Sequence, residues 1–132
     1  MIGLDTNVLV RYIVRDDPGQ TAAATRLIEG RCTPEDPGRV SLIVICELVW
    51  VLQRAYGYSR ETVSRVLETL LTSNELQVES ADLVWLSLRK YRKGAADVAD
   101  HLIGAINALH GAAPTFTFDQ RAASDPAFKL LG

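Results

Sequence analysis

The sequence predicts an α/β domain with three α/β/α layers around a small parallel sheet of four to five strands. Short apolar segments alternate along the chain with longer segments whose apolar residues recur at helical spacing. Parallel neighbouring strands need a crossover connection, and the intervening helices supply it. The length of 132 residues and the 48% hydrophobic content fit one domain with one core over residues 1–132.

The strands are expected where short apolar runs end at polar or turn-forming residues. The tail after the last strand is expected to be a loop with a short final turn or strand. The expected strands span residues 1–4, 39–43, 76–79 and 114–118.

The helices are expected between capping residues and glycines. Thr6 or Asn7 can cap the first helix, and the acidic pair before Pro18 can cap the second. Ser59 and Ser80 are suitable caps for two later helices. The expected helices span residues 8–14, 18–29, 44–56, 62–71, 81–93 and 97–109.

Charge and composition exclude several classes of protein. The net charge is −2 and the pI is about 5.6, whereas a general electrostatic nucleic-acid binder is basic. Contacts with nucleic acid are therefore expected to be local or metal-assisted. Cys32 and Cys46 are too few for a secreted disulfide scaffold and suggest free thiols in a reducing cytosol. Without a signal peptide or an apolar run of membrane-spanning length, we expect a cytoplasmic protein with no membrane segment.

Glu47 is the only charged residue in the apolar segment LIVICELVWVL, residues 42–52. Its helical neighbours three and four positions away are all apolar, and a helix that is apolar all round is expected to be buried. Burying an unpaired carboxylate costs several kcal/mol, so Glu47 should be paired, protonated or bound to a cation. Arg54, two turns away, is only a weak candidate partner. The alternative is an ordinary solvent-facing glutamate.

Four other acids lie where a parallel sheet would place a ligand site. Asp5 and Asp119 each follow a strand, and ligand sites lie beyond the carboxyl ends of strands. Asp97 and Asp100 share a helix face that Gly104 is expected to leave open. Each acid also has a purely structural explanation, as a helix cap, a partner of the helix dipole or a turn residue.

Carboxylates that converge on one edge repel one another, and a divalent cation would remove the conflict. Ligands that are all oxygen favour Mg²⁺, with Mn²⁺ as an alternative. Zinc is not expected, because neither His101 nor His110 has a cysteine partner at ligand spacing.

Four motifs occur in an order that resembles the PIN-domain ribonucleases, and most closely the VapC-type toxins of bacterial toxin–antitoxin pairs. They are LDTNVL, CELVWVL, DVADHLIGAINALHG and TFD, and the resemblance covers nearly the whole chain. It implies a PIN-like fold and an acidic quartet. The loop at residues 31–39 matches no motif, and His101 stands where a small residue is common. The implied quartet is Asp5, Glu47, Asp100 and Asp119.

The resemblance also implies supporting residues and a cofactor. Asp97 matches an additional acid, Asn7 a polar residue that orients water, and Thr117 a polar residue near the site. One or two Mg²⁺ ions are expected, with Asp5 and Asp100 as principal ligands and the other two quartet members completing the coordination. The implied reaction is endonucleolytic cleavage of RNA that leaves a 5′-phosphate and a 3′-hydroxyl.

The same resemblance implies an antitoxin protein as partner, a homodimer, and contact with DNA only through the antitoxin. Substrate RNA is expected to meet a basic helix end around Tyr91, where the ring could stack on a base. The alternative is a solvated helix end whose cations suit the dipole. The basic residues are Arg89, Lys90, Arg92 and Lys93.

Three alternative functions are open at this stage. A metal-dependent phosphatase of the haloacid-dehalogenase type needs a second aspartate two residues after the first, but position 7 is Asn7. A receiver-type signalling domain needs a lysine after a late strand, where Asp119 stands. A catalytically silent PIN-like scaffold that binds RNA or protein is disfavoured by the intact quartet.

Overall fold

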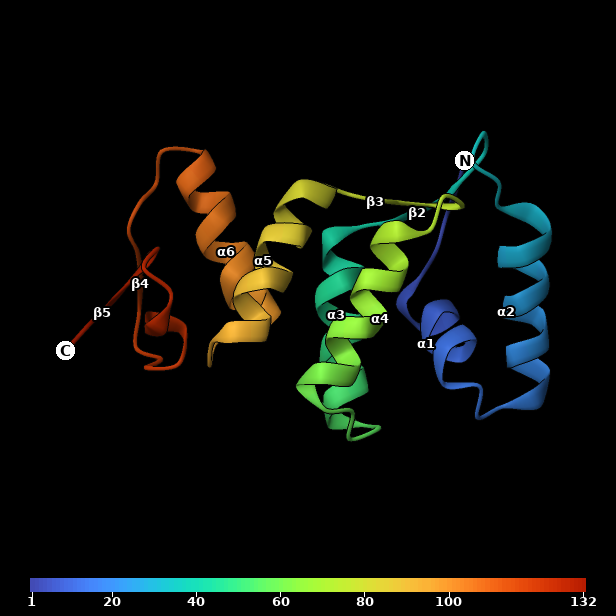
Figure 1. The fold of residues 1–132 in the computed structure, drawn as a ribbon, viewed down its shortest axis with the longest axis horizontal. Coiled ribbons are helices and arrows are strands. Elements are labelled where there is room, and N and C mark those ends of the chain that lie inside the picture. The colour runs from blue at the N-terminus through green and yellow to red at the C-terminus, as the bar shows by residue number, and fades with distance from the viewer. The chain divides into compact units, whose positions relative to one another are not determined.

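The computed structural model describes residues 1–132 and contains two compact units, which span Met1–Ala81 and Asp82–Gly132. We call them unit 1 and unit 2. Short parallel strands and helices follow one another in each unit, which confirms the predicted α/β class (Figure 1). A membrane-spanning helix is not found, because none combines the necessary length and hydropathy.

Unit 1 contains a parallel sheet of three strands in the order β1-β2-β3. Ile2 lies opposite Gly38, and Val40 lies opposite Val78. Both valines are buried. Because the strands are parallel, their carboxyl ends share one edge of the sheet. The strands are β1 (Ile2–Gly3), β2 (Gly38–Val40) and β3 (Leu76–Val78).

Side-chain caps begin the helices of unit 1. Asp17 accepts a hydrogen bond from the Gln20 N–H at 3.0 Å, and Pro18 occupies the first turn, as predicted. Ser59 also caps its helix as predicted. The expected strand at residues 39–43 was too long, because Ser41 accepts from the Val44 N–H and turns the chain into a helix. The helices are α1 (Thr6–Val14), α2 (Pro18–Arg31), α3 (Leu42–Arg54) and α4 (Arg60–Thr72).

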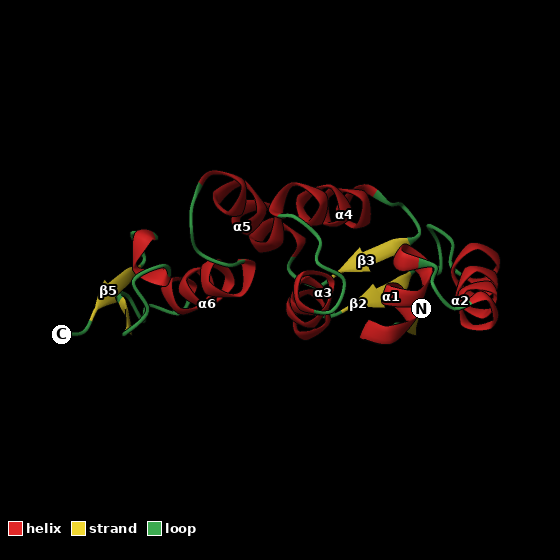
Figure 2. Cartoon of the chain, turned by 90° about the horizontal axis from the view of Figure 1, so that it is seen from below, coloured by secondary structure: helices red, strands yellow, loops and turns green.

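The core of unit 1 lies among these helices and the sheet. Helix α1 contacts α2 and α3, while α4 contacts α3 and β3. Figure 2 shows β2 and β3 side by side, with their arrowheads pointing the same way. The most completely buried apolar side chains of this core are Leu9, Val40, Ile45, Leu48, Leu52, Val63 and Leu67.

Unit 2 begins with two helices and ends with two paired strands. Strands β4 and β5 are parallel, with Thr117 opposite Leu130. The short turn and strand expected in the tail are both present. The elements are α5 (Ala81–Lys93), α6 (Val98–Leu109), β4 (Thr115–Thr117), the 3₁₀ turn η1 (Ala122–Ser124) and β5 (Phe128–Leu130).

Gly104 on α6 is a close-packing position. A Cβ atom at Gly104 would lie 2.8 Å from Cε2 of Phe128 and 3.1 Å from Cβ of Ala127. The expectation that Gly104 leaves the acidic face of its helix open was therefore wrong. The missing side chain instead lets the residues at the start of β5 approach the helix backbone.

A buried carboxylate holds the last part of unit 2. Oδ2 of Asp125, whose side chain has no exposed surface, lies 2.6 Å from His101 Nδ1 and 3.4 Å from Lys90 Nζ. Burial by itself would raise the pKa of Asp125. The Ala127 N–H, the His101 ring and Lys90 outweigh it, so the pKa lies below its ordinary value. The Asp125 carboxylate thus connects the segment before β5 to both α5 and α6.

Asp125→Asn should lower the free energy of unfolding of unit 2 by about 3 kcal/mol at pH 7, because it removes the charge from a buried pair. The depressed pKa means that the wild-type carboxylate stabilises the fold above about pH 4. That contribution is lost as the pH falls through the folded-state pKa. The difference in the free energy of unfolding between wild type and Asp125→Asn should therefore shrink at lower pH. Hydrogen exchange of the α6 amides in urea measures both effects. Asp82→Asn, an exposed change in the same unit, is the control; an equal effect there would contradict the assignment.

Candidate functional site

Asp5 lies two residues beyond the end of β1 and is the N-cap of α1. Its Oδ1 accepts a hydrogen bond from the Thr6 N–H at 2.8 Å. The expectation that Thr6 or Asn7 would cap this helix was therefore wrong. The cap fixes the direction of the carboxylate.

Thr6 connects Asp5 to the acid on α3. Its buried hydroxyl donates a hydrogen bond of 2.6 Å to Oε1 of Glu47, 41 residues along the chain. Thr6 was not identified as a site residue from the sequence. Its position directly after a candidate ligand was the available signal, but a contact between two helices has no local sequence pattern.

Glu47 is exposed, so the prediction of a buried carboxylate was wrong. Helix α3 does carry apolar residues on all sides, but Ile43 and Trp50 on the stripe that contains Glu47 are 73% and 60% exposed. The guanidinium carbon of Arg54, the weak candidate partner, instead lies 6.0 Å from the centroid of the Trp50 ring. Thr6 is the residue that holds Glu47.

Glu79 is a further acid that the sequence analysis did not single out. It follows β3, and its Oε1 accepts a hydrogen bond from the Leu42 N–H at 2.9 Å, in the first turn of α3. This role is structural, because it satisfies a backbone donor that has no partner within the helix.

Asp97 and Asp100 occupy the first turn of α6. Asp97 is the N-cap, and its backbone N–H donates to Oδ2 of Asp100 at 3.1 Å, as in a capping box. The expected helix began at residue 97, which would make Asp100 its fourth residue. It is in fact the third helical residue, because the helix begins at Val98. Both carboxylates therefore lie at the positive end of the helix dipole.

Asp119 lies beyond β4 and orders the turn that follows. Its Oδ1 accepts from the Arg121 N–H at 2.8 Å, and its own N–H donates to the Thr117 hydroxyl at 3.0 Å. Thr117, which was expected near the site, is thus a direct partner of Asp119. Asp119 is exposed, whereas Asp100 is half-buried.

The carboxylates of unit 2 influence one another. Partial burial raises the pKa of Asp100, and the negative charges of Asp97 and Asp119 raise it further. The hydrogen bond from the Asp97 N–H opposes this shift without cancelling it. A cation placed among these oxygens would relieve both the burial cost and the repulsion.

The basic residues of α5 differ in exposure. Arg89, Arg92 and Lys93 are exposed, whereas Lys90 is half-buried and forms an ion pair with Asp125. Tyr91 has no exposed surface, so the expectation of a stacking ring was wrong. The aromatic ring contributes to the core of the protein.

The predicted site residues thus form two groups, one in each unit. Asp5, Thr6, Asn7 and Glu47 lie in unit 1, and Asp97, Asp100, Thr117 and Asp119 lie in unit 2. Neither unit by itself brings three or more histidine, cysteine or carboxylate side chains together as a metal site. In each quartet member, one carboxylate oxygen accepts a hydrogen bond and the other is free to bind a ligand.

Asp119→Asn should move the pKa of Asp100 down towards its ordinary value, because it removes a neighbouring negative charge while keeping an oxygen for the Arg121 N–H. A pH titration of the Asp100 carboxyl carbon by NMR, in EDTA, measures the shift. Asp17→Asn is the matched control, since it changes a capping aspartate in unit 1. An unchanged Asp100 titration in Asp119→Asn would contradict the assigned interaction.

Comparison with known proteins gives one result for nearly the whole chain. The family model described as PIN domain matches residues 2–129, which include all the acids described above. No curated protein sequence matches the chain. The chain therefore belongs to the PIN domain family, whose members are generally nucleases that use divalent metal ions.

Proposed function

We propose that this protein is a Mg²⁺-dependent endoribonuclease and the toxin of a VapC-type toxin–antitoxin pair, with Mn²⁺ as an alternative ion. The observation that carries the proposal is the anchoring of four carboxylates at the positions of the quartet. Each is fixed through one oxygen and presents the other. Purely structural acids would not need to follow the family's pattern along the whole chain.

The donor set fits a hard divalent cation. All four side chains offer oxygen, which Mg²⁺ and Mn²⁺ prefer, and no histidine or cysteine joins them. The raised pKa of Asp100 has causes that a bound cation would offset. Asp5 and Asp100 would be the principal ligands, Glu47 and Asp119 would complete the coordination, and Asp97 would add negative charge.

Bound Mg²⁺ would supply Lewis-acid stabilisation of the charge that develops in phosphodiester hydrolysis and would acidify water. The protein's own residues orient the ligands. Thr6 holds Glu47 through its hydroxyl, and Thr117 holds the backbone of Asp119. The Asn7 amide, in the first turn of α1, would hold a water molecule. The expected product ends are a 5′-phosphate and a 3′-hydroxyl.

The proposed substrate is RNA in the cytoplasm, and the proposed partners are an antitoxin and a second copy of the chain. Arg89, Arg92 and Lys93 are the exposed cations that we assign to the RNA backbone. Lys90 belongs to the same segment but is occupied by Asp125. DNA would be contacted only through the antitoxin.

Asp5→Asn and Asp100→Asn should each reduce RNA cleavage by at least about 100-fold, because the ion contributes several kcal/mol and each 1.4 kcal/mol is a factor of ten. Asparagine keeps an oxygen for the backbone N–H that donates to each of these aspartates, so the fold should persist. Glu47→Gln should behave similarly. The measurement is cleavage of total cellular RNA with Mg²⁺, Mn²⁺ or EDTA.

The matched control for this experiment is Asp17→Asn, which neutralises a capping aspartate outside the quartet and should cleave like wild type. Full activity of Asp100→Asn would overturn the proposed site. If antitoxin-free wild-type protein binds Mg²⁺ but cuts no RNA, the protein is a silent binding scaffold. Hydrolysis of phosphomonoesters alone would instead support the phosphatase alternative.

Thr6→Val should weaken cleavage by about 10- to 100-fold, as expected when a residue that orients a metal ligand is lost. It should also raise the Mg²⁺ concentration needed for half-maximal activity, which a purely structural defect would not do. Thr6→Ser keeps the hydroxyl and should restore both values. Thr21→Val is the control, since Thr21 is also buried and donates to the Arg11 carbonyl. An unchanged Mg²⁺ dependence in Thr6→Val would contradict the positioning role.

A further inference from the structure

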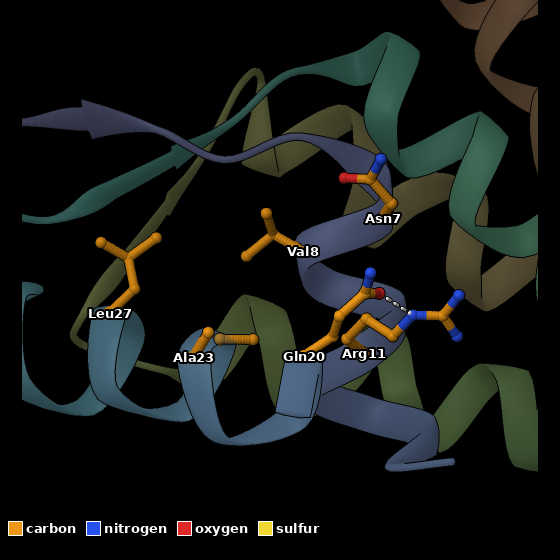
Figure 3. Close-up of a pocket in the computed structure, with 7 residues that line it drawn as sticks. Asn7, Val8, Arg11, Gln20, Ala23 and Leu27 are labelled. Carbon is orange, nitrogen blue, oxygen red and sulfur yellow. Dashed lines mark hydrogen bonds between the residues drawn. The ribbon is translucent and has the colours of Figure 1, made fainter. Parts of the chain in front are cut away.

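A pocket of about 290 Å³ lies between α1 and α2, entirely within unit 1. Its volume is at the lower end of the range for small-ligand sites. Figure 3 shows the amides of Asn7 and Gln20 towards one end of the pocket and Leu27 at the other. The lining residues are Asn7, Val8, Arg11, Gln20, Ala23, Ala24 and Leu27.

Arg11 fixes the orientation of the Gln20 amide. Arg11 Nε donates to Oε1 of Gln20 at 2.6 Å, and a guanidinium can only donate, so the oxygen of the amide is occupied (Figure 3). The NH₂ group of Gln20 therefore remains available as a donor. Arg11 is itself held by Asp16 at 2.8 Å and by the Tyr56 hydroxyl at 3.1 Å. The donor is thus set in place before any ligand arrives.

The charge in the pocket argues against an anionic ligand. The only cation that lines it, Arg11, is paired with Asp16, and the other lining residues are neutral. Val8, Ala23 and Leu27 offer aliphatic surface for a flat group. Two amides beside such surface match the edge and the faces of an uncharged heterocycle.

The pocket adjoins a candidate ligand of the proposed metal site. Asn7 lines the pocket and lies two residues after Asp5, in the first turn of the same helix. A phosphodiester held at Asp5 would therefore have its neighbouring nucleoside within reach of the pocket. Proteins commonly read single-stranded RNA through unstacked bases that enter such sites.

We propose that this pocket binds one nucleobase of the RNA, beside the scissile phosphodiester, and sets the base preference at that position. The inference deepens the proposed nuclease function and rests on it. The Gln20 NH₂ group would donate to an acceptor on the base edge. The Asn7 amide has both a donor and an acceptor group, so it would supply a second hydrogen bond to the base beside the one that it makes to the proposed water.

The test measures binding without cleavage. Fluorescent oligoribonucleotides of a single base type, one series for each base, are titrated against the full chain in EDTA. Wild type should prefer one base by about tenfold, the discrimination that one good amide–base pair gives. Ala23→Phe, which fills the pocket, should abolish the preference. Ala22→Phe is the matched control, because Ala22 is exposed on the same helix and does not line the pocket.

Gln20→Glu separates hydrogen bonding from volume. The carboxylate still accepts from Arg11 but has no donor, so the preference should fall or change to another base. Absence of any base preference in wild type, or an equal loss in Ala22→Phe and Ala23→Phe, would overturn the pocket assignment even if RNA is cleaved. The pocket assignment is supported if Ala23→Phe and Gln20→Glu remove the base preference and Ala22→Phe does not. This holds even if a parallel assay with Mg²⁺ shows no RNA cleavage, a result that would overturn only the proposed nuclease function.

Discussion

The strands of unit 1 run parallel, so a helical crossover must begin after β1 and again after β2, and this constraint organises everything at that edge of the sheet. Each strand end supplies an oxygen to a helix start. Asp5 caps α1, Ser41 caps α3, and Glu79 accepts a backbone N–H from the same first turn of α3. The polar side chains that bind the first turns of these helices thus lie at the edge of the sheet where α/β proteins bind their ligands.

Each acid of the proposed site has a structural role beside the ligand role that we propose for it. Asp5 and Asp97 are N-caps, Asp100 accepts an N–H within the first turn of its helix, and Asp119 orders a turn. Helix N-termini stabilise such charges even though the carboxylates repel one another. The repulsion still appears in the pKa of Asp100, which burial and two neighbouring acids raise. In unit 2, structural anchoring and electrostatic repulsion therefore act on the same carboxylates.

Local rules predicted the elements, because helix starts and ends depend on adjacent residues. The helix at residues 81–93 and the caps Asp17 and Ser59 are examples. Tertiary relations were harder to predict. The exposure of Glu47 depends on which stripe of an apolar helix meets the core, and the burial of Tyr91 places an aromatic ring among exposed cations. The contact between Thr6 and Glu47 joins residues that no sequence spacing relates.

The carboxylate oxygens that accept backbone hydrogen bonds hold the site residues in place, and the negative charge is what would make the site reactive. A substitution can remove the charge and keep the oxygen. An amide at Asp5 or Asp100 would accept the same backbone hydrogen bond that the carboxylate accepts. A substitution of this kind would therefore remove the proposed catalysis without lowering the stability of the fold. The protein would stay folded and keep its binding surfaces. The same property lets a gene duplicate become a recognition protein by a single side-chain change, since selection against unfolding would not oppose it.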